Sequence, residues 1–220
     1  MMISPDDGFI IKLVAHSVKV LQALSVVERW KQLGVALLRR KNAQPTVEVL
    51  RRNANLWIDC FIVFKWVLVG GLFWFSQGGW LASVVVSYLL FFNVFSYFYY
   101  HGWGSKHETP KLPQNAILQR DRRRLVSFLL AFFFSLLGFA YLYAIQLPHR
   151  LEWPTEPNKL DAIFLSVSNS FTLTYSGFQP CDQLARGVLL LQVLNVFVFL
   201  TVLIGNAVPS VGRSDPDEGA

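Results

Sequence analysis

Four apolar runs, each long enough to cross a lipid bilayer, dominate the pattern of hydrophobic and polar positions along the chain. They are Trp57–Ser76, Trp80–Tyr100, Leu125–Leu147 and Leu184–Val208. A transmembrane helix needs about 20 consecutive, predominantly apolar residues. Only Gln77-Gly78-Gly79 separates the first two runs, and so short a turn predicts an antiparallel hairpin. The pattern therefore predicts four transmembrane helices.

The N-terminal segment Phe9–Leu38 has a different pattern, in which apolar residues recur at helical spacing with basic residues between them. The apolar positions are Phe9, Leu13, Val20, Leu24, Val27 and Leu38, and the basic ones are Lys12, Lys19, Arg29 and Lys31. This spacing predicts an amphipathic helix. Such a helix either lies on the membrane surface or packs in the cytosol against its own protein or its copies, and the sequence leaves both open.

The segment Asp161–Pro180, DAIFLSVSNSFTLTYSGFQP, is too short and too polar to cross a bilayer, yet it lies between two runs that can. Thr, Ser, Tyr and Gly gather where an ordinary connecting loop would carry charge. Polar backbone at membrane depth is tolerated only where it is buried in protein or lines water. A half-length helix followed by a Gly-containing extended segment is one way to build a selectivity filter from carbonyl groups. The segment therefore predicts a re-entrant helix and loop.

Within this segment, Ser170–Phe178 reads SFTLTYSGF and resembles the pore loop of the potassium-channel superfamily. Members of that superfamily carry a pore helix, a motif close to TLTTVGYGD and an inner helix. A looser likeness covers Leu125–Val208. The resemblance implies a selectivity filter formed by Thr172, Leu173, Thr174, Tyr175, Ser176, Gly177 and Phe178, with Phe178 in the place of the family's tyrosine.

The same segment departs from the family motif at four positions. Tyr175 and Ser176 stand where the family has Thr and Val, and Gln179 and Pro180 stand where it has the second Gly and the Asp. Another register sets the Thr172–Ser176 pentapeptide on TVGYG but loses both glycines. The first register is preferred because it keeps Gly177, and glycine adopts left-handed backbone at little cost. The departures leave the ion selectivity open.

One pore loop per chain cannot enclose a pore, so the resemblance implies a homotetramer. The expected permeant ion is a monovalent cation of the potassium kind, and no cofactor is expected. On the last apolar run, Gln192 and Asn195 are three residues apart and share a helical face. They are expected either to line the cavity below the filter or to form interhelical hydrogen bonds.

Composition and charge support a membrane location. Hydrophobic residues make up 53% of the 220 residues and come in long blocks, which excludes an ordinary soluble domain. The net charge is +6, and basic residues cluster before the first run and in the His101–Arg124 loop. The positive-inside rule then places both termini and this loop on the cytoplasmic side of the membrane. The membrane is expected to be a plasma or inner membrane. Anionic lipids near the basic loops are the expected partners, and nucleic acid is not.

Enzyme signatures are absent from the sequence. The four histidines have no metal-ligand spacing, and there is no GxSxG, HExxH or P-loop motif. We therefore expect no catalytic residue, no metal site and no enzymatic activity. Lys65 lies inside the first apolar run, where a cation costs about 2.5–3.5 kcal/mol to insert. It either has an intramembrane role or packs against a neighbour's polar group while its end snorkels.

Taken together, these patterns predict an all-α integral membrane protein with four transmembrane helices, a re-entrant pore helix and filter loop before the last span, and an N-terminal amphipathic helix. The expected segments are a cytoplasmic basic N-terminal part (1–54), a helical hairpin (55–100), a basic cytoplasmic loop (101–124), a pore domain (125–208, with the pore loop at 161–180) and a disordered tail (209–220). The expected function is passive cation conduction through a homotetrameric pore. The alternative is a non-conducting membrane scaffold or partner subunit with a channel-like fold.

Overall fold

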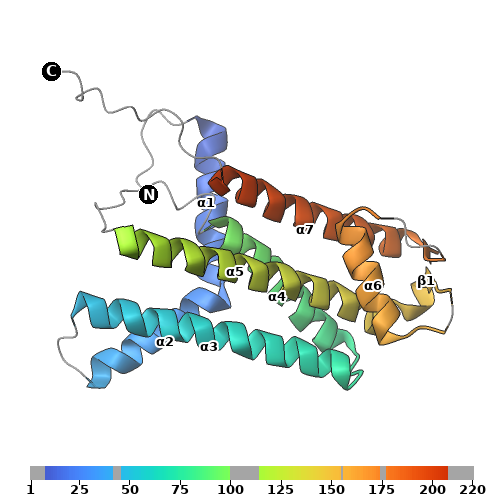
Figure 1. Ribbon diagram of the computed structural model, residues 1–220, viewed down its shortest axis with the longest axis horizontal. Coiled ribbons are helices and arrows are strands. Elements are labelled where there is room, and N and C mark those ends of the chain that lie inside the picture. The colour runs from blue at the N-terminus through green and yellow to red at the C-terminus, as the bar shows by residue number, and fades with distance from the viewer. Residues whose placement is uncertain (1–7, 42–45, 100–113, 155, 174–176, 208–220) are drawn as a thin grey trace. The chain divides into compact units, whose positions relative to one another are not determined.

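The computed structural model describes residues 8–41, 46–99, 114–154, 156–173 and 177–207, which are mostly helical. Four helices are long and apolar enough to cross a membrane, and they are Arg52–Trp74, Trp80–Phe98, Leu125–Gln146 and Gln183–Thr201. The prediction of a helical chain with four apolar helices of membrane-spanning length is confirmed. The filter positions Thr174–Ser176 and the tail 209–220 lie outside the described residues. The chain divides between Phe92 and Asn93 into two compact units, whose helices are labelled in Figure 1.

In the first unit, the N-terminal segment forms two helices, α1 (Phe9–Leu24) and α2 (Val26–Lys41), and not the single helix that the sequence predicted. The chain leaves helical geometry at Ser25, whose ψ is 118°. Tyr88 bridges the break: its hydroxyl donates to the carbonyl of Leu24 at 2.9 Å and accepts from the N–H of Val26 at 3.1 Å. Because helix ends leave backbone groups unpaired, this side chain stabilises the break.

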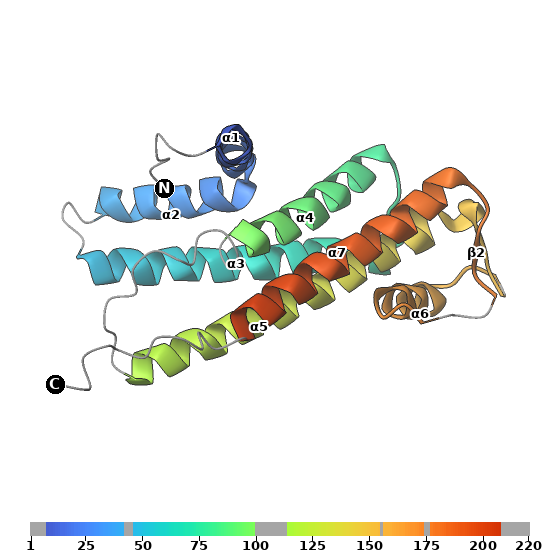
Figure 2. The ribbon, with the colours of Figure 1, turned by 90° about the horizontal axis from the view of Figure 1, so that it is seen from above.

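Helix α2 lies alongside α3 (Val47–Trp74), as Figure 2 shows. A Cβ at Gly34 would lie 2.2 Å from the Trp57 ring, so glycine permits the close approach of the two helices. Asn53 also donates to the Gly34 carbonyl at 2.8 Å. One turn earlier in α2, Trp30 stacks on Phe64 with ring centroids 5.9 Å apart. The helices are therefore antiparallel, and α2 packs against its own chain.

The turn after α3 follows the expected short connection to α4 (Trp80–Phe98). Ser76 and Gly79 have φ values of 52° and 117°, and the N–H of Gln77 donates to the Leu72 carbonyl at 2.9 Å. This bond closes the helix end in the manner of a Schellman motif. Lys65, midway along α3, is only 7% exposed and so is packed among its neighbours.

The second unit begins within α4 and continues into α5 (Gln114–Tyr141), so part of the expected 101–124 loop is helical. The elements that follow are a π-helix (Leu142–Gln146), a 3-10 helix (Pro148–Arg150), β1 (Leu151–Glu152), α6 (Lys159–Ser170), β2 (Gln179–Pro180) and α7 (Gln183–Ala207). Helices α6 and α7 both pack on α5. The two strands pair antiparallel, Leu151 opposite Pro180 and Glu152 opposite Gln179, and the sequence did not predict them.

An aromatic core joins α5 and α7 in this unit. Phe199 is fully buried, and its ring lies 5.9 Å from Phe128 and 5.2 Å from Tyr97, centroid to centroid. Next to this core, the Asn93 amide donates to the Ala131 carbonyl at 2.8 Å and to the Ser135 hydroxyl at 3.1 Å. These contacts hold the end of α4 against α5.

Candidate functional site

Helix α6 is the short helix that the sequence predicted before the last apolar run. It has 12 residues, and Asn158 caps its start by accepting a hydrogen bond from the N–H of Asp161 at 2.7 Å. At its end, the N–H of Leu173 donates to the Ser168 carbonyl at 2.8 Å. Thr172 between them has a φ of 54°, the left-handed conformation of a Schellman cap. A β-branched residue rarely adopts this conformation.

One face of α6 is buried and partly polar. Its buried residues are Ala162, Leu165, Ser166 and Ser170, whose spacing follows one stripe of a helix. The Ser166 hydroxyl donates to the Leu136 carbonyl of α5 at 2.8 Å. Phe164 is exposed on the opposite face, and Ile163 is exposed at the edge of the buried stripe. The helix therefore directs hydroxyl groups at its neighbours and apolar groups outward.

Gln192 of α7 is the centre of a buried polar network. Its side-chain NH₂ group lies within hydrogen-bond distance, 2.8 Å in each case, of the Ser166 carbonyl and of the hydroxyls of Ser166 and Ser170. Its carbonyl oxygen accepts from the Tyr143 hydroxyl at 2.6 Å and from the Asn169 amide at 3.0 Å. Asn169 also donates to the Leu189 carbonyl at 3.0 Å. We call these five side chains the Gln192 network.

The π-helix at the end of α5 determines where Tyr143 lies. A π-turn shifts the residues that follow it around the helix axis relative to a regular α-helix, and such turns occur often at functional sites. Tyr143 is fully buried within this turn and directs its hydroxyl at Gln192. Sequence reasoning singled out Gln192 alone. The spacing of Ser166, Asn169 and Ser170, at i, i+3 and i+4 on one helical face, is the signal in the sequence that could have identified these three members, whereas nothing in the sequence marks Tyr143.

Gln192 and Asn195 were expected either to line a cavity or to form interhelical hydrogen bonds. Gln192 is 1% exposed and turned toward α6, so within this chain it forms interhelical hydrogen bonds and lines no open cavity. Further copies of the chain can only cover more of its surface. Asn195 is 9% exposed, and its side-chain oxygen is buried without a hydrogen-bond partner.

The described filter residues flank the undescribed positions 174–176. Thr172 and Leu173 are exposed on the α6 side. On the other side Gly177 has a φ of 95°, and a Cβ there would lie 2.8 Å from Cβ of Pro154. Both the left-handed backbone and the close approach require glycine, which confirms the expectation that Gly177 needs glycine's backbone freedom.

A clamp formed by Arg150, Trp153, Phe178 and Asp182 holds the part of the loop that follows Gly177. The Phe178 ring meets Trp153 edge to face with centroids 5.0 Å apart. Arg150 forms an ion pair with Asp182, and Asp182 also caps α7 by accepting from the N–H of Ala185 at 2.8 Å. The Ala185 N–H, together with Arg150, lowers the pKa of the Asp182 carboxyl below its usual value. The loop is thereby tied to both its preceding connector and the start of α7.

A cleft of about 180 Å³ lies between α6, α7 and the clamp. Its lining is mainly apolar, with two amides, and comprises Leu151, Leu165, Asn169, Leu173, Phe178, Gln179, Pro180 and Leu189. Among the residues that the structure describes, no group of His, Cys, Asp or Glu side chains could hold a metal ion.

No protein-family model matches the chain, and neither a curated protein nor a solved structure matches it. The functional interpretation therefore depends on the geometry of α6, the loop and the Gln192 network.

Proposed function

We propose that this chain is one subunit of a cation channel, in which four copies surround a pore and the loop between α6 and α7 forms its narrowest passage. The loop's carbonyl and hydroxyl oxygens replace the hydration shell of a monovalent cation. The proposed filter is Thr172–Phe178, and the remainder of 125–208 supports it.

The observation that carries the proposal is the attachment of α6 to the middle of two apolar helices. At 12 residues, α6 is too short to cross a bilayer. Ser166 nevertheless bonds to Leu136, well inside the apolar helix Leu125–Gln146, and Gln192 lies near the middle of Gln183–Thr201. A short helix bonded to mid-span residues supports a re-entrant position for α6. The loop that follows then has polar backbone at membrane depth, which is tolerated where it lines water.

The backbone on either side of the loop also supports this function. Thr172 ends α6 abruptly in left-handed backbone. Gly177 is also left-handed, and it turns the chain toward the clamp. Such turns direct successive carbonyl groups away from the hydrogen bonds of a helix. These carbonyl groups are then free to face an ion. The clamp through Phe178 and Asp182 fixes the loop's outer end. Fixed ends hold the loop's oxygen atoms in place to replace the hydration shell of an ion.

A tetramer accounts for the outward face of α7. This face is apolar and exposed in the single chain, with its largest residues being Leu190, Leu191, Leu194, Phe197 and Leu200. Four copies arranged around an axis would cover part of it and enclose a passage that one loop cannot.

Ion flux from liposomes that hold the purified full-length protein tests the proposal, with potassium, sodium and chloride gradients compared and with voltage steps applied in planar bilayers. We expect cation flux without chloride flux, and loss of the flux in Gly177→Ala. Gly187→Ala is the matched control, because a Cβ at Gly187 of α7 meets no other atom within 4 Å. No cation flux from protein shown to be tetrameric would favour the non-conducting scaffold, and a monomer without flux would defeat the pore altogether.

A further inference from the structure

The cleft between α6, α7 and the clamp has the size of a single aromatic ring. Its volume is about 180 Å³. An engineered protein cavity of about 150 Å³ accepts benzene. Pockets that hold drug-sized ligands are larger, at about 300–1,000 Å³. A ring with one or two small substituents therefore fits the cleft, and a drug-sized ligand does not.

The walls of the cleft favour an apolar and aromatic occupant. Leu165 of α6 and Leu151 of β1 are buried in the lining, and Leu189 of α7 is half-buried there. The ring of Phe178 forms another part of the wall. Aromatic rings attract one another in edge-to-face and offset arrangements. An aromatic ring in the cleft would therefore contact three aliphatic side chains and one ring.

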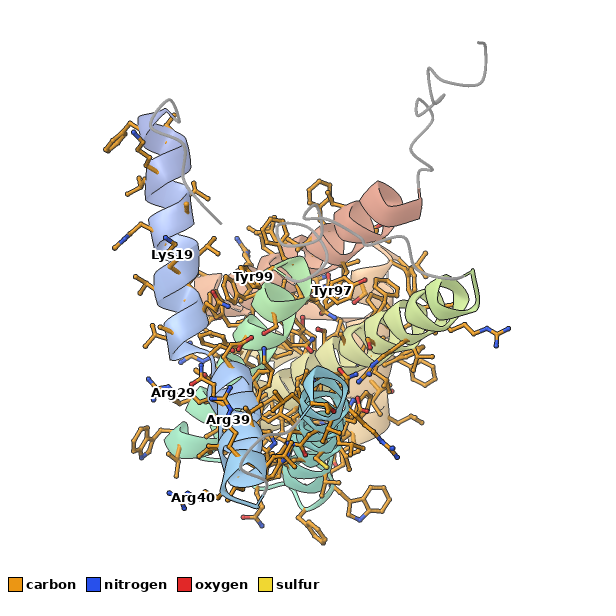
Figure 3. The ribbon with its side chains drawn as sticks, turned by 90° about the vertical axis from the view of Figure 1, so that its left-hand side faces the viewer. Lys19, Arg29, Arg39, Arg40, Tyr97 and Tyr99 are labelled. Atoms are coloured by element: carbon orange, nitrogen blue, oxygen red, sulfur yellow. The ribbon has the colours of Figure 1, made fainter. Side chains whose placement is uncertain are left out.

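Charged side chains lie on other parts of the chain. Figure 3 shows Lys19 projecting from α1, and Arg29 and Arg39 projecting from α2. In the clamp beside the cleft, Arg150 is paired with Asp182. Among the described residues that line the cleft, none carries a charge. An ion would lose its hydration in the cleft without gaining a partner of opposite charge, so we expect a neutral occupant.

Asn169 gives the cleft a hydrogen-bond acceptor. Its NH₂ group donates to the Leu189 carbonyl and to the Gln192 side chain, both at 3.0 Å. These bonds direct the NH₂ group at α7 and fix the orientation of the amide. Its carbonyl oxygen accepts no hydrogen bond from the part of the chain that the structure describes. A ligand beside Asn169 therefore meets an unpaired acceptor, which a hydroxyl group can satisfy.

We propose that this cleft is a binding site for a small, neutral phenol. The hydroxyl donates to the Asn169 carbonyl oxygen, and the ring lies against Leu165 and Phe178. A phenol is uncharged at neutral pH and carries one hydroxyl donor. Water is a poorer occupant, because the apolar walls leave it with too few hydrogen-bond partners. The site does not depend on whether the chain conducts ions.

The position of the site connects it to the loop between α6 and α7. Leu173 and Phe178 both line the cleft, and they lie on either side of positions 174–177. A ring bound in the cleft therefore contacts both ends of this segment. Because a ligand stabilises the arrangement that binds it, the phenol should hold these two ends in the positions that they have here.

The test uses the purified full-length protein in phosphatidylcholine nanodiscs at neutral pH, with para-fluorophenol as the probe. Binding is measured by the broadening of the probe's fluorine NMR signal during a titration. The matched probe is para-fluorotoluene, in which a methyl group of similar size replaces the hydroxyl. Both probes also dissolve in lipid, so each affinity is divided by the partitioning of that probe into empty nanodiscs. On this scale, we expect the phenol to bind about two- to tenfold more tightly.

Two variants locate the site. Leu173→Trp should abolish binding of both probes, because the larger ring takes up space in the cleft. Leu160→Trp is the matched control, since Leu160 lies outside the lining and is 62% exposed, against 63% for Leu173. In Gln179→Met the preference for the phenol should remain, although Gln179 is the other amide of the lining.

Several results would overturn the proposal. Equal binding of the two probes would remove the hydrogen bond to Asn169 from the interaction. Loss of the preference in Gln179→Met would make Gln179 the acceptor in place of Asn169. Binding that persists in Leu173→Trp would place the phenol elsewhere. No binding beyond that of empty nanodiscs would show that a lipid chain fills the cleft or that the cleft accepts no ring.

Discussion

The Tyr143 hydroxyl donates a 2.6 Å hydrogen bond to the side-chain oxygen of Gln192, which joins the π-turn after α5 to the middle of α7. Asn169 of α6 donates to the same oxygen at 3.0 Å. Three elements therefore meet at one buried amide. Fully paired buried polar groups specify one packing arrangement, because any other arrangement leaves groups unpaired. The position of α6 depends on this pairing.

Gln192→Met should destabilise the second unit by about 1–3 kcal/mol. Methionine has nearly the same shape but leaves the groups around it, on Tyr143, Asn169 and Ser170, with fewer partners. Thermal unfolding in detergent, followed by the amount of folded protein in size-exclusion chromatography, measures the change. Gln183→Met is the matched control, since Gln183 is exposed at the start of the same helix. Equal stability of the two variants would show that the network does not hold α6.

Tyr143→Phe should cost about 1–2 kcal/mol, because it removes the donor to Gln192 without changing the ring. The double variant Tyr143→Phe with Gln192→Met should lose less stability than the sum of the two single losses, since both substitutions remove the same hydrogen bond. The double-mutant cycle is measured by the same thermal unfolding. Strict additivity would contradict a direct coupling between the two side chains.

Gly177→Ala should destabilise the loop by about 1–3 kcal/mol, because alanine resists a φ of 95° and its Cβ would meet the Pro154 ring. Proteolysis of the reconstituted protein and the flux assay measure the effect on the loop and on conduction. Gly187→Ala, in regular helix with open space around it, should be neutral or slightly stabilising. If Gly177→Ala resembles this control in both assays, the loop does not depend on left-handed backbone at this position.

Thr172→Gly should stabilise the end of α6 by about 0.5–1 kcal/mol. Glycine relieves the unfavourable left-handed backbone of a β-branched residue, although it also makes the unfolded chain more flexible. Ser168→Gly, in the regular part of the same helix, should instead destabilise by about 0.5–1 kcal/mol. The two thermal shifts should have opposite signs. A destabilising Thr172→Gly would mean that the Thr172 side chain contributes more than its backbone costs.

Asp182→Asn should remove a pH-dependent part of the second unit's stability. The pKa of the Asp182 carboxyl is lowered in the folded chain, chiefly by the Ala185 N–H and also by Arg150, so the folded state holds the proton less tightly than the unfolded state. The resulting stabilisation is complete above the usual pKa of an aspartate and is lost as the pH falls through the lowered one. Wild-type and variant unfolding curves should therefore differ most near neutral pH and converge in acid. A difference in stability between wild type and variant that is the same at all pH values would exclude the ionised carboxylate as its origin. Glu156→Gln serves as the control for an exposed acid.

Several features follow from neighbouring residues alone and could be predicted from the sequence. The four apolar helices depend on the length and composition of continuous runs. The shortness of α6 follows from where the apolar pattern of Asp161–Ser170 gives way to the polar FTLTYSG segment. The need for glycine at position 177 was predicted from the loop pattern, and its φ confirms it. All of these are local properties, because helix length, polarity and backbone freedom belong to the segment itself.

Other features were decided only by the tertiary structure. No proline or glycine marks the break at Ser25, which is stabilised by Tyr88, more than 60 residues later in the chain. Likewise, the face that Gln192 shares with Asn195 was evident in the sequence, but its direction toward α6 was not. An apolar helix with polar residues at two positions can turn either toward a cavity or toward a neighbouring helix. The choice depends on which donors and acceptors the neighbouring helix offers at that depth, and packing alone brings Ser166, Asn169 and Tyr143 to that place.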